Sequence, residues 1–146
     1  MGVEWIEYGL VGLFLGAFLS ATILPLPSEA MLISALELEI APVPVLFVAT
    51  SGNFLGGLTN YYIGFKANNE TLLNRFKLNT EKIKLWEIRT NRWGYWLGLL
   101  SWFPFVGDPM VVALGFLRVS FWPLAVMIFI GKFLRYAALI WLYFQM

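Results

Sequence analysis

The segments ILPLPSEAM, residues 23–31, and WFPFVGDPM, residues 102–110, decide the fold, because the second repeats the first at an offset of 79 residues. In this register Glu29 falls on Asp108. The identities, which continue without a gap into the next apolar stretch, are Pro25 with Pro104, Met31 with Met110, Leu38 with Leu117, Pro44 with Pro123, Gly52 with Gly131, Phe54 with Phe133 and Leu55 with Leu134. Membrane transporters are often built from two such halves, with the working site where the halves meet.

The composition indicates an integral membrane protein. Hydrophobic residues make up 60% of the 146 residues and charged residues only 13%, whereas a soluble domain has about 25% charged residues. The chain has neither cysteine nor histidine, which excludes disulfides, thiolate nucleophiles and the commonest metal ligand. Since no catalytic motif is visible either, the sequence predicts a single membrane domain over 1–146 that is not an enzyme, with no metal, cofactor or nucleic-acid partner.

The first half of the chain predicts a re-entrant hairpin followed by a spanning helix. Residues 8–28 carry no charge and are long enough for the roughly 20 residues that a bilayer requires. Pro25 and Pro27 then break the helix, and the apolar run at 30–36 is too short to cross. Broken backbone at membrane depth is tolerated only inside protein or beside water. We therefore expect a hairpin that returns to its own side, although a full crossing is the open alternative, and the uncharged stretch 40–65 is the clearest span.

The second half repeats this order. Residues 93–107 are uncharged but short, Pro104 and Pro109 mark the expected break, and the apolar run resumes at 110–117. The last span, 121–144, carries two cations near its middle. Repeat one therefore covers about 8–65 and repeat two about 93–144, and the expected fold is all-α, with two re-entrant helical hairpins that are each followed by a transmembrane helix.

The basic loop at 66–92 sets the expected orientation. It holds seven basic residues against three acidic ones, a net charge of +4, and positive loops stay in the cytoplasm. The second hairpin should then open to the cytoplasm and the first to the outside, as in an inverted repeat. Ile83, Leu85 and Trp86 predict either the apolar face of an interfacial helix or, equally well, one amphipathic turn in a solvated linker.

Five polar residues fall near the predicted membrane midplane. They are Glu29, Asn53, Asp108, Lys132 and Arg135. A charge at the bilayer centre costs about 2.5–3.5 kcal/mol on insertion scales, so we expect the two acids at the hairpin tips to face the two cations. Two interpretations follow: a polar cavity that takes a proton, an ion or an anionic headgroup, or ion pairs that only pin the hairpins to the long helices.

Several segments resemble the YqaA-like branch of the DedA superfamily, whose members are also called SNARE-associated or VTT-domain proteins. The similar segments are PSE at 27–29, GNFLGGLTN at 52–60, LSWFPFVGD at 100–108 and GKFLRY at 131–136. The resemblance implies a multi-pass protein of the bacterial inner membrane with two opposed re-entrant hairpins. It also implies lipid translocation, such as recycling of undecaprenyl phosphate or phospholipid scrambling, and proton-dependent membrane homeostasis.

The resemblance also assigns residues and shows departures. Glu29 falls where better-studied members have a functional acid, but Asn53 falls where they usually have an aspartate. Ser101 and Gly107 stand where the second hairpin usually carries two arginines. Either the cations of the last span supply the displaced positive charge, or this branch does something else.

Taken together, the sequence predicts a small transporter or a lipid flippase or scramblase. Its substrate would be an anionic lipid, such as a polyprenyl phosphate, or a small solute, with or without proton coupling and as a monomer or a homo-oligomer. The alternative is a non-transporting membrane protein that organises lipid or partners and whose buried charges are purely structural.

Overall fold

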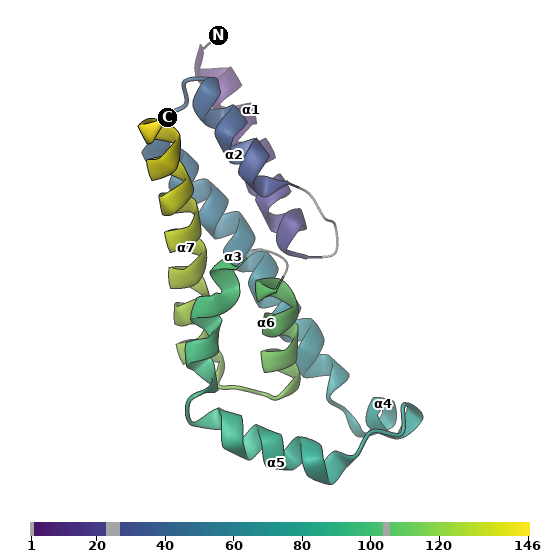
Figure 1. Ribbon diagram of the computed structural model, residues 1–146. Helices are drawn as coiled ribbons and strands as arrows, with labels where there is room; N and C mark the ends of the chain where they lie inside the picture. Colours follow the sequence, from purple (N-terminus) through teal and green to yellow (C-terminus); the bar gives the residue numbers. More distant parts are fainter. Residues whose placement is uncertain (1, 23–26, 104–105) are drawn as a thin grey trace. The chain divides into compact units, whose positions relative to one another are not determined.

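The computed structural model describes residues 2–22, 27–103 and 106–146, and all regular structure in these ranges is helical (Figure 1). This confirms the all-α prediction. The elements in chain order are α1 (Gly2–Ala21), α2 (Ser28–Glu37), α3 (Pro42–Ala67), α4 (Glu70–Arg75), α5 (Thr80–Asn91), the 3₁₀ helix η1 (Gly94–Trp102), α6 (Gly107–Phe116) and α7 (Phe121–Gln145).

Two of these helices are long and apolar enough to cross a bilayer. They are α1, over Glu4–Ala21, and α7, over Phe121–Gln145. At 1.5 Å per residue, the 26 residues of α3 reach about 39 Å, which is long enough. However, α3 is not among the candidate spans, because polar residues such as Thr50, Asn53 and Asn60 lower its hydropathy. By length and hydropathy α7, rather than 40–65, is the clearest span, and that α3 also crosses the membrane stays a prediction.

The helix boundaries repeat at the same 79-residue offset as the sequence. Residues 28–37 form α2 and residues 107–116 form α6, so both ends of the second helix lie 79 positions after those of the first. The long helices α3 and α7 begin at residues 42 and 121, again 79 apart. Because the same local structure is built twice from largely different residues, these boundaries support an internal repeat. That the two halves are inverted and re-entrant stays a prediction.

The turn after each short helix is repeated as well. Glu39 and Arg118, which are 79 residues apart, both adopt the left-handed conformation, with φ of 61° and 55°. Each is followed by an apolar residue, Ile40 or Val119, whose amide donates to the carbonyl five residues earlier, at 3.2 Å and 3.1 Å. This is the Schellman arrangement that satisfies the last carbonyls of a helix. Both apolar residues are buried, so each turn is fixed by packing as well as by hydrogen bonds.

One compact unit contains Met1–Gly57 and Lys132–Met146. In it α1 and α2 lie side by side (Figure 1), and the first part of α3 crosses α1. A Cβ on Gly52 would overlap the Phe14 carbonyl oxygen, and one on Gly56 would lie 2.6 Å from the Phe18 carbonyl oxygen. Glycine is therefore required where these two helices approach each other closely. The buried core around this crossing consists of Leu13, Leu32, Ala35, Leu36, Ile40, Val45, Ala49 and Tyr136.

The second compact unit is Leu58–Gly131. Here η1 contacts α6, and α6 crosses the second part of α3 through glycines on both helices. A Cβ on Gly64 would overlap the Val112 carbonyl oxygen, and one on Gly115 would overlap the carbonyl oxygen of Tyr61. The Tyr61 hydroxyl donates to the Val119 carbonyl oxygen at 2.7 Å. The single domain predicted over 1–146 is not tested by this division into units.

The segment before α6 differs from an ordinary helix. Its nine residues at 94–102 form a 3₁₀ helix, although such helices seldom exceed three or four residues. A 3₁₀ helix rises about 2.0 Å per residue against 1.5 Å for an α-helix, so the short apolar stretch reaches about 18 Å instead of about 14 Å. Close packing accompanies the tighter coil, since a Cβ on Gly98 would lie 2.9 Å from the Leu124 side chain.

The predicted hairpin breaks are visible in part. Pro27 is the N-cap residue of α2, with φ of −79° and ψ of 81°, so its backbone is not helical and the helix begins after it. Pro109 is the third residue of α6, a first-turn position where the missing amide proton costs nothing, so it lies within a helix and does not mark a break as expected. Pro25 and Pro104 lie outside the described residues.

The basic segment at 66–92 is mostly helical. Asn69 caps α4 by accepting from the Leu72 amide at 2.9 Å, and Asn79 caps α5 by accepting from the Glu81 and Lys82 amides at 3.1 Å and 3.2 Å. Because α5 has 12 residues, the segment contains a three-turn helix rather than one turn in a linker. Ile83 is half-buried whereas Leu85 and Trp86 are exposed, so these three residues do not form the single apolar face that was expected.

Candidate functional site

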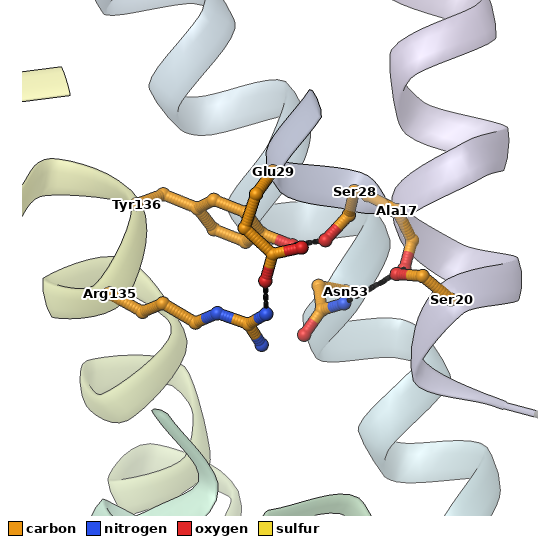
Figure 2. Close-up of polar contacts among 7 residues, drawn as sticks. All are labelled: Ala17, Ser20, Ser28, Glu29, Asn53, Arg135 and Tyr136. Carbon is orange, nitrogen blue, oxygen red and sulfur yellow. Dashed lines mark hydrogen bonds and ion pairs between the residues drawn. The ribbon is translucent and has the colours of Figure 1, made fainter. Parts of the chain in front are cut away.

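Polar side chains from four helices of the first unit, α1, α2, α3 and α7, converge near the start of α2 (Figure 2). Ser28 and Glu29 are its first two residues, and Pro27 before them has a non-helical conformation. Asn53 comes from the middle of α3, and Arg135 and Tyr136 come from α7. An acid in the first turn of a helix is favoured by the partial positive charge of the free amides.

Glu29 and Arg135 form an ion pair. The arginine side chain is 13% exposed and the glutamate side chain 36%, so the cation is the more deeply buried partner. The guanidinium carbon also lies 5.6 Å from the centre of the Tyr136 ring, within the range of a cation–π contact. The sequence predicted that Glu29 would face a cation of the last helix, and the structure shows Arg135 in that place.

Tyr136 and Ser28 form a second contact between α7 and α2. The tyrosine hydroxyl donates to the serine Oγ at 3.0 Å, and both side chains are buried. Sequence reasoning did not include these two residues among the candidates. A signal was present, since each is the direct neighbour of a predicted charged residue within a segment that carried the family resemblance.

Asn53 holds a buried acceptor that lacks a partner among the described residues. The side chain is 1% exposed, and its Nδ2 donates to the Ala17 carbonyl oxygen at 2.9 Å and to Ser20 Oγ at 3.1 Å. A carbonyl can only accept, so the amide NH₂ must face Ala17 and Oδ1 must point away, towards Arg135 in Figure 2. Within the described part of the chain, this oxygen has no hydrogen-bond partner, and neither has the buried Oγ1 of Thr50, one turn earlier on α3.

Buried polar atoms in native proteins nearly always have a hydrogen-bond partner, so these two oxygens are acceptors available to a donor group. The arrangement around Arg135 therefore offers a cation for an anionic group and an amide oxygen for a proton donor. Within residues 2–22, 27–103 and 106–146, no group of three or more acidic side chains is placed to hold a metal ion.

The remaining predicted residues are Lys132 and Asp108. Lys132 is fully buried and lies in the same unit as Glu29, Asn53 and Arg135. Asp108 is half-buried and belongs to the other unit. It is the second residue of α6, as Glu29 is of α2, so the sequence equivalence of the two acids is also an equivalence of helix position. That both acids face both cations stays a prediction.

Comparisons with known proteins match almost the whole chain. The VTT domain family matches residues 26–145. The Escherichia coli K12 protein named "Inner membrane protein YqaA" is 38% identical over 134 residues, which cover 88% of this chain and 87% of the relative. An uncharacterised Haemophilus influenzae protein is 37% identical over 149 residues, covering 94% and 89% of the two chains.

A more distant relative comes from the archaeon Methanocaldococcus jannaschii. It is 25% identical over 136 residues, which cover 92% of this chain and 83% of the relative. No solved structure matches the chain. The family match covers more than half of the chain, and the bacterial relatives agree with it over nearly their full lengths, so the chain belongs to the VTT domain family, in the YqaA-like branch of the DedA superfamily.

Proposed function

We propose that this protein is an inner-membrane transporter or flippase for an anionic lipid or a small anionic solute, which competes with Glu29 for Arg135. The observation that supports this most directly is the ion pair at the start of α2. Its location in the inner membrane is supported by the composition and by the name of the Escherichia coli relative.

The asymmetry of the ion pair suggests how an anion would enter. Arg135 is held among buried side chains, whereas the Glu29 side chain is about one-third exposed. The pair therefore opens most easily by movement of the glutamate. A phosphate or carboxylate group can then take its place, because the planar guanidinium binds such groups through two parallel hydrogen bonds.

Charge balance suggests proton coupling in the same step. With Glu29 ionised and Arg135 charged, the pair is neutral, and an added anion would leave a net negative charge in a low-dielectric site. Protonation of the Glu29 carboxylate removes that excess. A proton and an anion entering together keep the site neutral, and the Asn53 amide oxygen is an acceptor for a donor group on the substrate or on protonated Glu29.

The proposed pathway also includes two charged residues of the second repeat. Asp108 occupies in α6 the position of Glu29 in α2, and Lys132 adds a second buried cation on α7. We assign both to the same pathway, with hairpins that open on opposite sides of the membrane and the 66–92 segment in the cytoplasm. Anionic phospholipids or polyprenyl phosphates are the proposed lipid substrates.

Flux in proteoliposomes tests the proposal. Purified protein is reconstituted, and transfer of fluorescent phosphatidylglycerol, and separately of a polyprenyl phosphate, is followed with and without a pH gradient. Arg135→Gln should abolish transfer, and Glu29→Gln should abolish its dependence on the pH gradient. Glu39→Gln is the matched control, because this acid is exposed. Flux at the wild-type level in a folded Arg135→Gln protein would refute the proposal.

A second candidate is the non-transporting membrane protein, and one observation favours it. Both the Glu29–Arg135 pair and the Tyr136–Ser28 hydrogen bond tie α2 to α7, as expected of contacts that only pin a hairpin in place. In that case the flux in vesicles with the wild-type protein is no higher than the flux in empty vesicles. The same substitutions then lower the stability of the protein and have no effect on flux.

A further inference from the structure

Helix α5 buries one narrow face in the protein and leaves most of its large apolar side chains exposed. Thr90 is buried, and Ile83 and Glu87 are half-buried. These three residues share one face at 100° per residue. On this inner face the Glu87 carboxylate accepts from the Asn68 side chain, and the Thr90 hydroxyl donates to the Trp86 carbonyl oxygen at 2.7 Å.

The outer face of α5 carries large apolar side chains. Leu85 is 47% exposed, Trp86 52% and Ile88 71%, and Trp93, just beyond the helix, is 51% exposed. A helix on the surface of a soluble protein shows the opposite arrangement, with its apolar stripe inward. A cluster of large apolar side chains that faces away from the protein marks an interaction surface.

Two arginines lie within this apolar surface. Arg89 and Arg92 line a shallow hollow of about 490 Å³ together with Trp86, Ile88 and Trp93. The guanidinium carbon of Arg89 lies 5.6 Å from the centre of the Trp86 ring. Aromatic rings beside arginines match the lipid headgroup region, where tryptophan is enriched and phosphates are available to a guanidinium.

We propose that Leu85, Trp86, Ile88 and Trp93, with Arg89 and Arg92, bind the interface of an anionic phospholipid bilayer. Charge complementarity favours this occupant, because the 66–92 segment has a net charge of +4 and each basic residue near an anionic surface contributes about 1 kcal/mol. Position favours it too, since α5 ends only two residues before the apolar η1. The proposal does not depend on transport.

Site-directed spin labelling tests it on the full chain, which contains no cysteine of its own. A label at Ile88→Cys is compared with one at Asn74→Cys, an exposed position on α4 that lines a polar pocket. The protein is reconstituted in vesicles of equal parts phosphatidylethanolamine and phosphatidylglycerol, or of phosphatidylcholine alone. In anionic vesicles we expect the Ile88 label to be accessible to oxygen but shielded from a water-soluble nickel complex, and the Asn74 label to show the reverse.

Arg89→Gln combined with Arg92→Gln should shift the Ile88 label towards water. Two contributions of about 1 kcal/mol each correspond to a roughly 30-fold fall in the ratio of docked to undocked helix. The protein without these two substitutions should show a similar fall in phosphatidylcholine vesicles, which carry no net charge. A label at Leu85→Cys repeats the measurement if Ile88→Cys does not fold. Full water accessibility at both outer positions in anionic vesicles would overturn the proposal. Efficient cross-linking of Ile88→Cys between copies, with shielding unaffected by lipid charge, would assign this face to a second copy and also overturn it.

Discussion

Replacing Glu29 with glutamine should destabilise the protein more than replacing its partner Arg135 with methionine. Loss of one partner from a fully buried pair costs about 3–5 kcal/mol, and loss from an exposed pair costs about 0–1 kcal/mol. Glu29→Gln leaves behind an arginine side chain that is 13% exposed and stays charged, whereas Arg135→Met leaves a glutamate that is 36% exposed and can neutralise its charge by taking up a proton. We therefore expect about 2 kcal/mol for the first change and about 1 kcal/mol for the second.

The double variant provides the coupling energy. Because Glu29→Gln and Arg135→Met remove the same contact, the cost of both together should fall short of the sum of the single costs by about 1 kcal/mol. Glu39→Gln, an exposed position after α2, should change the free energy of unfolding by less than about 0.5 kcal/mol.

The assay is reversible unfolding in mixed micelles by titration with dodecyl sulfate, followed by tryptophan fluorescence. The reasoning fails if Arg135→Met costs as much as Glu29→Gln. It also fails if the single costs simply add, because two residues that form an ion pair must then be energetically independent.

Three further predictions follow from backbone geometry and topology. Gly115→Ala should lower the free energy of unfolding by about 1–3 kcal/mol in the same titration, because the added Cβ would overlap the Tyr61 carbonyl oxygen. Gly12→Ala, at a position with open space around it, should lower it by nothing. Equal effects of the two changes would contradict the close crossing of α6 and α3. Glu39→Gly should raise the free energy of unfolding by about 1 kcal/mol, since glycine adopts its left-handed conformation (φ 61°) without strain, and a loss would show that the side chain stabilises the turn. A cysteine at Asn79 should react with a membrane-impermeant maleimide only in inverted vesicles, and labelling in intact cells would refute the cytoplasmic position of the 66–92 segment.

The sequence was sufficient for features that depend on near neighbours. The 79-residue register foretold that 28–37 and 107–116 would have the same structure, because helix starts and ends follow from prolines, polar caps and apolar runs within a few residues. It also indicated Glu29 and Arg135 as an ion-pair candidate, since charges in an apolar stretch require partners. It did not reveal that 94–102 would be a 3₁₀ helix. That coil is accompanied by close packing of the Leu124 side chain against Gly98, a contact between residues that are distant in the chain.

Tertiary structure decided which groups meet. Lys132 and Arg135 are three residues apart, so their directions around α7 differ by only about 60°, and the sequence left both as partners for Glu29. The rotation and tilt of α7 against α2 bring the guanidinium to the carboxylate and the neighbouring Tyr136 hydroxyl to Ser28. Helix packing also leaves the Asn53 Oδ1 without a hydrogen-bond partner among the described residues. The Ala17 carbonyl oxygen on α1 accepts from Asn53 Nδ2, and this hydrogen bond turns Oδ1 away from α1. These contacts join residues that are distant in the chain, and only the packing of whole helices determines them.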